Sequence, residues 1–285
     1  MPVFDWYQGT IPKPLNDVLE VLSGLGPDLL ISHDRGMHGY QRAAVLGSSS
    51  LGPVARVLYG GCHEYPHAIL SGEWAQPGSE LIRAAFPVHS VSRLDVREDF
   101  SDPGAFDSIQ DHLIAIAGQH RLKVGTAGDH LLTMKGRTTY LGAKSSPVQL
   151  RLYDKRAELL AGYATDGERK AAAVALALPE QLARLEAQIR PERKEAKLRF
   201  STIEPTEALG SSRWMREVWK VVAGLDLTPV QVGRGYRQSD DERSASFLVA
   251  NYGGLLRRMR QALGSWEGVG VRLGQDVDKR QGNPI

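Results

Sequence analysis

Side chains capable of acid–base, nucleophilic and metal chemistry recur at every second position in three short segments. These are Arg93, Asp95 and Arg97; Arg151, Tyr153 and Lys155; and Arg184, Glu186, Gln188 and Arg190. Because successive side chains of a β-strand point to opposite faces, each set shares one face of its strand. If the strands join one sheet, carboxylates, a phenol and cations converge on one surface. An antiparallel sheet with one solvated face produces the same alternation, so the pattern permits chemistry without requiring it.

Tyr153 is the phenol of this surface. A tyrosine hydroxyl has a pKa near 10, so only about one in a thousand is ionised at pH 7, and neighbouring cations raise that fraction. Arg151 and Lys155 flank Tyr153 two residues away on either side of the predicted strand. Tyr140 lies across the same predicted hairpin. From the residues alone, packed cross-strand aromatics are the preferred interpretation of both tyrosines.

The elements that would position these side chains are strands interspersed with helices. Apolar–polar alternation predicts strands at 3–11, 90–100 and 182–190, and hairpins at 54–72 and 131–155. Helical spacing and end signals predict helices at 15–26, 79–86, 102–120, 157–177 with a break near Gly167, 206–225 and 246–273. The order predicts an α+β fold with a central antiparallel sheet and flanking helices. We expect a domain at 1–204 and a helical C-terminal region at 205–285.

The charge is nearly balanced overall but uneven along the chain. The 285 residues carry 35 Lys and Arg against 33 Asp and Glu, a net charge of +2. Residues 135–156 hold six cations against one carboxylate, and residues 184–199 hold six against three. These clusters are typical either of a nucleic-acid contact or of a solvated basic face.

Several classes of protein are disfavoured. Cys62 is the single cysteine, which suits a reducing cytoplasm, and no apolar run is long enough to span a membrane. The chain contains no GxxxxGK[ST], CxxC, HExxH or GxSxG motif, so it lacks the local signatures of P-loop nucleotide hydrolases, zinc proteases and α/β-hydrolases. His63 and His67 stand four apart, but Pro66 between them disfavours a helical metal-ligand pair.

The sequence resembles the replication initiation factors of rolling-circle plasmids and filamentous phages, a family that also includes relaxases of integrative elements. The matching segments, in the family's order, are FDWYQGTI, HDRGMHGYQRA, ILSGEW, SRLDVREDF, TTYLGAKSS followed by LRLYDKR, and RLEAQIRP. YLGxxxS followed by RxYxK is the specific part. The helical tail, with WMREVWKVVAGL and NYGGLLRRM, is most similar to the phage branch.

The resemblance implies a metal-dependent endonuclease of the HUH type that nicks one strand of its origin. The enzyme joins itself to the 5′ phosphate through tyrosine and leaves a 3′ hydroxyl as primer. The family's relatives hold their metal with two histidines one residue apart, a pair that this chain lacks. Carboxylates would replace them and hold Mg²⁺ or Mn²⁺, with Asp95, Glu186 and Asp5 as ligands and Asp99 as a weaker candidate.

The resemblance also implies the remaining roles. Tyr153 would be the nucleophile, with Lys155 and Arg151 as the cations that assist it. Tyr140 would be the alternative nucleophile, because YLGAKSS is equally part of the match and its hydroxyl could reach the same phosphate across the hairpin. The predicted DNA contacts are Lys144, Ser145, Ser146, Arg156 and Arg190, together with Arg257 and Arg258 of the helical tail. The expected partners are double- and single-stranded origin DNA, a host helicase and a host polymerase, in the cytoplasm of a bacterium and without a membrane.

Three other functions remain open from the sequence. A mobilisation relaxase would use the same chemistry at a different origin. A DNA-binding regulator would keep the fold without the catalysis, although Tyr153, Lys155, Asp95 and Glu186 are all present. In an interaction protein, the two basic clusters would be solvated faces only.

Overall fold

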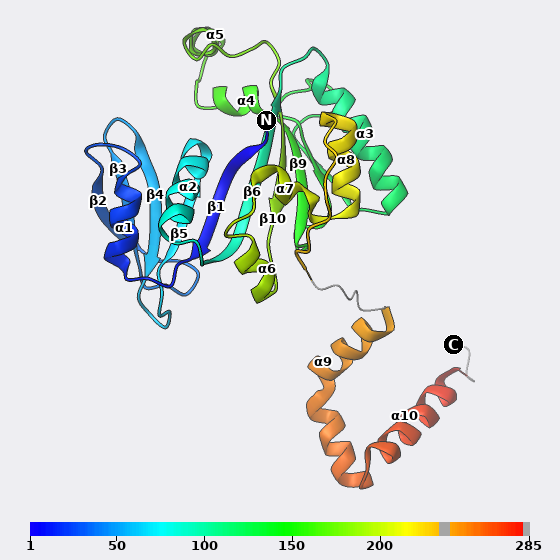
Figure 1. The fold of residues 1–285 in the computed structure, drawn as a ribbon. Helices are drawn as coiled ribbons and strands as arrows, with labels where there is room; N and C mark the ends of the chain where they lie inside the picture. Colours follow the sequence, from blue (N-terminus) through cyan, green and yellow to red (C-terminus); the bar gives the residue numbers. More distant parts are fainter. Residues whose placement is uncertain (234–239, 282–285) are drawn as a thin grey trace. The chain divides into compact units, whose positions relative to one another are not determined.

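The computed structural model describes residues 1–233 and 240–281 of the chain. The chain divides into two compact units, Met1–Arg234 and Gly235–Ile285. The first unit contains a sheet and its helices, and the second contains two helices (Figure 1).

A single antiparallel sheet of ten strands organises the first unit. The strands are β1 (Val3–Thr10), β2 (Leu30–Arg35), β3 (Arg42–Ser48), β4 (Gly52–Tyr59), β5 (His67–Ser71), β6 (Ser90–Phe100), β7 (Val124–Ala127), β8 (Thr138–Leu141), β9 (Val148–Asp154) and β10 (Ala183–Ile189). Their order across the sheet is β2-β3-β4-β5-β1-β6-β10-β9-β8-β7. The three strands that carry the polar sets, β6, β10 and β9, are therefore direct neighbours, as the proposed convergence requires.

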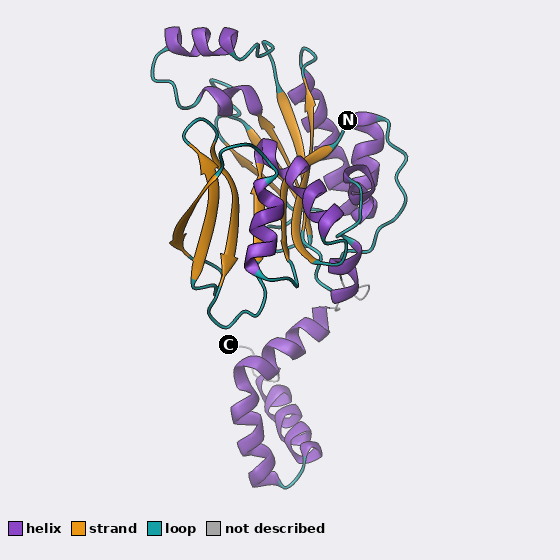
Figure 2. Ribbon diagram, turned by 60° about the vertical axis from the view of Figure 1, so that its left-hand side comes forward, coloured by secondary structure: helices purple, strands orange, loops and turns teal. Residues whose placement is uncertain are grey.

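The helices of the first unit are α1 (Leu15–Ser23), α2 (Ala75–Ala85), α3 (Ala105–His120), α4 (Lys155–Leu160), α5 (Asp166–Ala175), α6 (Lys194–Arg199), α7 (Pro205–Ala208) and α8 (Arg213–Ala223), with short 3₁₀ turns at Gly72–Trp74 and Leu209–Ser211. Most of them lie on one face of the sheet, whereas α4 and α5 lie apart and form a small apolar cluster of their own (Figure 2). α2 contacts β1 and β5, α3 contacts β8 and β9, and α8 packs on α3. The main core lies between these helices and the sheet.

The two faces of the central strands differ in the way that the alternation predicted. On β9, Leu150 and Leu152 are fully buried in the main core, while Arg151 and Tyr153 point to the opposite face. On β6, Leu94 and Val96 enter the same core. The polar residues between them therefore lie on the face away from the core helices, which we call the open face.

The second unit consists of two helices, α9 (Asp240–Leu263) and α10 (Trp266–Gln281). Gly264, with φ of +80°, lies in the turn between them, where a left-handed backbone favours glycine. Within 1–233 and 240–281, no helix is both long and apolar enough to cross a membrane.

The domain boundary differs from the expected one near residue 205. Residues 205–223 belong to the first unit because the apolar side of α8 is part of its main core: Met215, Val218 and Trp219 have no exposed surface. His120 of α3 also contacts Glu217 of α8 at 2.6 Å. The strong amphipathicity of the 206–225 segment predicts a helix but does not show which body the apolar side faces.

Candidate active site on the open sheet face

The pairing of strands sets the positions on the open face. Glu186 on β10 is paired with Arg97 on β6 and with Arg151 on β9. Gln188 is paired with Asp95, so Asp95 and Glu186 are diagonal neighbours on adjacent strands. The sequence predicted that these polar sets meet, and the sheet brings them together.

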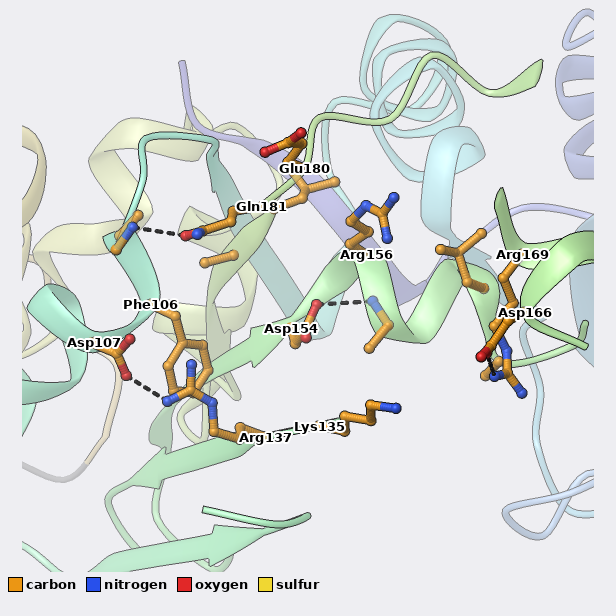
Figure 3. A pocket seen from close by; sticks show the side chains of 17 residues that line it. Phe106, Asp107, Lys135, Arg137, Asp154, Arg156, Asp166, Arg169, Glu180 and Gln181 are labelled. Carbon is orange, nitrogen blue, oxygen red and sulfur yellow. Dashed lines mark hydrogen bonds and ion pairs between the residues drawn. The ribbon is translucent and has the colours of Figure 1, made fainter. Parts of the chain in front are cut away.

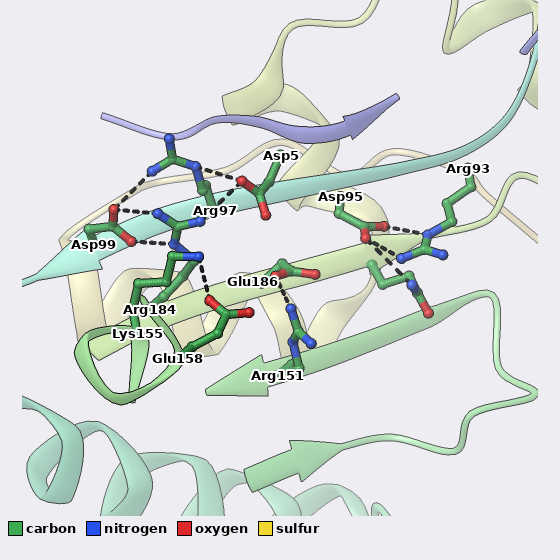
Figure 4. Close-up of polar contacts among 11 residues, drawn as sticks. Asp5, Arg93, Asp95, Arg97, Asp99, Arg151, Lys155, Glu158, Arg184 and Glu186 are labelled. Atoms are coloured by element: carbon green, nitrogen blue, oxygen red, sulfur yellow. Dashed lines mark hydrogen bonds and ion pairs between the residues drawn. The ribbon is translucent and has the colours of Figure 1, made fainter. Parts of the chain in front are cut away.

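Arginines contact every carboxylate of this surface (Figure 4). The Arg184 guanidinium donates to Asp99 from Nε and Nη2, at 2.6 and 2.8 Å, and to Asp5 from Nη1 at 3.1 Å. Arg97 pairs with the same two aspartates, at 2.9 Å to Asp5 and 2.8 Å to Asp99. This arginine–aspartate cluster of four residues ties β1, β6 and β10 together, and Asp5 belongs to it.

Asp95 and Glu186 lie outside that cluster and are the most deeply buried carboxylates of the open face. Asp95 is 2% exposed; Arg93 Nε donates to it at 2.9 Å, and Gln188 Nε2 at 3.5 Å. Glu186 is 5% exposed and accepts from Arg151 Nη2 at 2.6 Å. Burial raises the pKa of Glu186 to about 7, Arg151 opposes the rise, and the charge of Asp95 adds to it. Ionisation of Glu186 is therefore harder in the folded protein than in water, because Arg151 does not fully offset the effect of burial.

The metal triad predicted from the resemblance is only partly assembled. Asp95 and Glu186 lie together, whereas Asp5 is held in the arginine–aspartate cluster. Among residues 1–233 and 240–281, no group of three or more His, Cys, Asp or Glu side chains is arranged to hold a metal ion. Two buried carboxylates nevertheless suit Mg²⁺ or Mn²⁺ as ligands, since Mg²⁺ commonly takes one or two carboxylates and completes its shell with water and substrate phosphate.

Tyr153 lies on the open face but is only 5% exposed. The Arg151 guanidinium covers its ring at 4.2 Å, and Lys155 Nζ is 5.9 Å from the ring centre. Burial raises the pKa of Tyr153 and the Glu186 charge adds to the rise, while Arg184 and Arg151 oppose it. The cations act to lower this pKa, as expected, but the net shift is upward because burial and a buried carboxylate outweigh them.

The sequence predicted that Lys155 lies on the same strand as Tyr153, but in the structure it lies beyond the end of that strand. β9 ends at Asp154, whose carboxylate caps α4 by accepting from the Ala157 amide at 2.8 Å. Lys155 is the first residue of α4, and its Nζ contacts Glu158. It still lies beside Tyr153, but it approaches from the helix end.

Tyr140 lies on the open face on the next strand. It is paired with Arg151 and is only partly buried. On its other side β7 presents Gly125, whose lack of a side chain leaves the ring uncrowded. Tyr140 lines a cavity of about 300 Å³ together with Lys123, Lys144 and Gln149. Tyr140 is thus a tyrosine with open space and two lysines beside it.

The β8–β9 turn carries the predicted phosphate contacts. Lys144 and Ser145 are exposed and Ser146 is partly exposed. Arg190 binds the backbone of this turn: its Nη1 donates to the Lys144 carbonyl at 3.0 Å, and its Nη2 contacts Gln188. Arg190 therefore braces the turn, whereas Lys144 and Ser145 remain available to a ligand.

Arg156 lies apart from that turn. Its Nε donates to the Pro179 carbonyl at 2.9 Å, and it lines a cavity of about 550 Å³ (Figure 3). The cavity's charges are balanced; they are Lys135, Arg137, Arg156 and Arg169 against Asp107, Asp154, Asp166 and Glu180. Arg257 and Arg258 are exposed on α9 of the second unit. The structure thus distributes the predicted DNA contacts over several surfaces.

Sequence reasoning missed two residues of the open face. Lys123 lies just before β7, a four-residue strand too short to show periodicity. Trp6 on β1 was counted only as a strand-forming aromatic, yet it is on the same face as Asp95, its register partner. Its alternation with Phe4, which is in the core, could have identified its face.

Comparison with known proteins gives a likeness of fold. A solved structure described as a rolling circle replication initiator protein from Geobacillus stearothermophilus matches with a TM-score of 0.50 and 19% sequence identity, covering 85% of this chain and 90% of that one. No protein-family model matches the chain, and a search of curated proteins found no match. The chain therefore has an initiator-like fold, an antiparallel sheet with flanking helices and a helical C-terminal part, as the sequence predicted.

Proposed function

We propose that this protein is a replication initiator that nicks one strand of its origin DNA through a tyrosine and remains joined to the 5′ phosphate. The observation that carries the proposal is the open face, where two buried carboxylates, Asp95 and Glu186, share one surface with a partly exposed tyrosine, Tyr140, that has lysines beside it. Arg151 lies between Glu186 and Tyr140 as the register partner of both. The likeness of fold to a rolling circle initiator and the YLGxxxS…RxYxK resemblance both support it.

Tyr140 is the better nucleophile of the two tyrosines on the face. Tyr153, the first choice from the sequence, has its ring covered by Arg151 and its pKa raised by burial. A phosphate would have to displace that guanidinium to reach it. Tyr140 already borders open space beside Lys123 and Lys144. Tyr153 then serves as the packed partner that holds Arg151 between the tyrosines and Glu186.

The reaction is a transfer of one phosphoester bond. The Tyr140 hydroxyl loses its proton and its oxygen forms a bond to phosphorus. The bond from phosphorus to the 3′ oxygen breaks, and that oxygen takes up a proton to become the primer hydroxyl. Lys123, Lys144 and Arg151 are the cations that stabilise the phenolate and the charge on the phosphoryl oxygens. Because the phosphotyrosine link conserves the ester, the strand can be rejoined later.

Asp95 and Glu186 would hold the divalent ion. When bound, Mg²⁺ or Mn²⁺ supplies Lewis-acid polarisation of the scissile phosphate. Asp5 and Asp99 of the arginine–aspartate cluster each contact two guanidinium groups, so they are not assigned as metal ligands. Their role would be to hold β1, β6 and β10 in register.

The wider role follows from the same resemblance. The helical tail supports an assignment to the phage-like branch, in which the free 3′ hydroxyl primes a host polymerase and a host helicase opens the duplex. Arg257 and Arg258 on α9 would contribute to the choice of origin, because they are exposed cations on a helix of suitable width for the major groove.

The test is the formation of a covalent adduct. Wild-type protein incubated with Mn²⁺ and a labelled pool of random single-stranded oligonucleotides should give a labelled protein band that survives denaturation. Asp95→Asn, Glu186→Gln and chelator should each abolish the band, because the ion is lost. Glu20→Gln, an exposed carboxylate on α1, is the matched control. A band of equal strength in the presence of chelator would contradict the metal-dependent reaction, and no band under any condition would contradict the nicking function.

A further inference from the structure

A second cavity on the open face lies on the far side of Asp95 from the tyrosines. It has a volume of about 500 Å³ and extends over β3, β4, β5, β1 and β6. Its lining residues are Trp6, Gln8, Met37, His38, Val45, Pro53, Val54, Ala55, Arg56, Ile69, Ser71, Ser92, Arg93 and Arg190. None of the functional roles assigned above uses this volume.

The lining itself holds three arginines and no carboxylate, in contrast to the balanced cavity around Arg156. Two of the three are ion-paired at its edge, Arg56 with Asp34 at 3.2 Å and Arg93 with Asp95. The floor is apolar, with Val45 and Ile69 buried on it, and the rim carries amide and hydroxyl groups from Gln8, Ser71 and Ser92. An apolar floor, a hydrogen-bonding rim and three guanidinium groups together suit a nucleobase with its phosphate.

Trp6 forms a rigid wall of the cavity. Its indole Nε1 donates to Gln8 Oε1 at 2.8 Å, and Gln8 Nε2 donates to Ser92 Oγ at 3.1 Å. The Arg93 guanidinium lies over the Trp6 ring at 4.5 Å. Because the ring and its arginine are both held in place, they provide a preorganised surface on which a base can stack.

Arg93 also connects the cavity to the proposed active site. The same guanidinium that covers Trp6 donates to Asp95. A strand whose scissile phosphate lies beside Asp95 and Glu186 would therefore bring a neighbouring nucleotide to Trp6. Spacing along the sheet agrees, since Trp6 is the register partner of Asp95 on the adjacent strand.

We infer that this cavity binds one unpaired nucleotide of single-stranded DNA, with its base stacked against the Trp6–Arg93 pair and its phosphate near Arg56 or Arg190. The inference rests on the proposed function and deepens it, because it assigns a base-binding subsite for the single-stranded substrate to named side chains. A base in a closed duplex is stacked on both sides and is not free to enter such a cavity.

Binding measurements test the inference without any cleavage. The probes are an oligothymidylate and a fully abasic oligomer of the same length, which have the same phosphates and differ only in the bases. Wild type should bind the oligothymidylate more tightly. Trp6→Ala should reduce that preference by about 5-fold to 150-fold, the effect of losing one base stack, and leave the affinity for the abasic oligomer unchanged. Trp6→Phe should restore part of the preference.

Two further variants distinguish the loss of a stacking surface from a folding defect in Trp6→Ala. Ser71→Phe places a ring in the cavity from the β5 partner of Trp6 and removes no core side chain, so it should cause the same loss. Tyr65→Ala removes an aromatic that is 39% exposed outside the cavity, and should change nothing.

The outcomes separate this inference from the proposed function. A preference for bases that persists in both Trp6→Ala and Ser71→Phe overturns the inference that the cavity binds a base, even if wild type forms the covalent adduct. Absence of any preference for bases in wild type overturns it as well. Loss of the preference in the two variants supports the cavity, whatever the result of the adduct assay.

Discussion

Replacing Glu186 by glutamine provides a test of the open face that does not depend on catalysis. Burial raises the pKa of Glu186 from 4.5 to about 7 in the folded protein. Its contribution to stability is therefore fully present below about pH 4.5 and is lost as the pH rises through 7, because ionisation is harder in the folded state than in the unfolded chain. The shift of 7 − 4.5 corresponds to about 3 kcal/mol at 1.36 kcal/mol for each pKa unit.

Glutamine keeps the size of the side chain and cannot ionise. Glu186→Gln should therefore gain stability relative to wild type as the pH rises, by about 3 kcal/mol between roughly pH 5 and pH 8. Urea denaturation of both proteins at a series of pH values measures the difference, and Glu20→Gln on the exposed side of α1 controls for a general change in charge. A difference that does not vary with pH would show that burial does not raise the pKa of Glu186.

The same pair of proteins reports metal binding. At about pH 8, a divalent ion at ten times its dissociation constant should stabilise wild type by about 1.4 kcal/mol. Glu186→Gln should show much less stabilisation because it lacks one of the two anionic ligands. Equal stabilisation of both proteins by Mg²⁺ or Mn²⁺ would place the ion elsewhere.

Three further predictions concern Gly210 in the second 3₁₀ turn, the two lysines beside Tyr140, and the second unit. Gly210→Ala should lower the unfolding free energy by about 2 kcal/mol or more, because the added Cβ would lie 2.0 Å from the Thr228 carbonyl oxygen. Urea denaturation measures the change. An unchanged unfolding midpoint would refute the close approach of the two backbone segments. Lys123→Ala and Lys144→Ala should each reduce the slope of log affinity against log salt for single-stranded DNA by about 1, and slopes equal to wild type would remove both lysines from the DNA contact. A chain ending at residue 233 should still form the adduct but lose its preference among DNA sequences; retained preference would refute the role of Arg257 and Arg258.

The sequence predicted the central strands well because one face of each strand packs in the main core and the other is the polar open face. Residues 90–100 and 182–190 alternate apolar and polar types along their length, and both are strands. Residues 182–190 contain Leu, Ala and Glu that favour helix, so the period, rather than the propensity, identified the strand. β2 was missed, and all its residues are exposed at an edge of the sheet, so no burial pattern marks it.

The candidate site was predicted at the level of the surface and not of the individual contacts. Alternation shows which polar residues share a face with Asp95, Glu186 or Tyr153 on each strand, and the pairing of the strands then brings the three sets to one face. The sequence does not show that Asp5 is bound by Arg97 and Arg184, because that contact depends on a bulge in β1 between Phe4 and Trp6. Nor does it show that Arg151 covers Tyr153, since both the rotamer and the burial are set by neighbouring strands.

Identification of the covalently modified tyrosine distinguishes Tyr140 from Tyr153 as the nucleophile. Wild-type protein is trapped with single-stranded DNA in Mn²⁺ and digested with nuclease and protease. The peptide that carries a nucleotide is then sequenced by mass spectrometry, and Tyr140→Phe and Tyr153→Phe are treated in parallel. We expect a nucleotide on Tyr140, no adduct in Tyr140→Phe, and an adduct in Tyr153→Phe. A nucleotide on Tyr153 would make Tyr153 the nucleophile, and an adduct on a residue outside the open face would contradict the site itself.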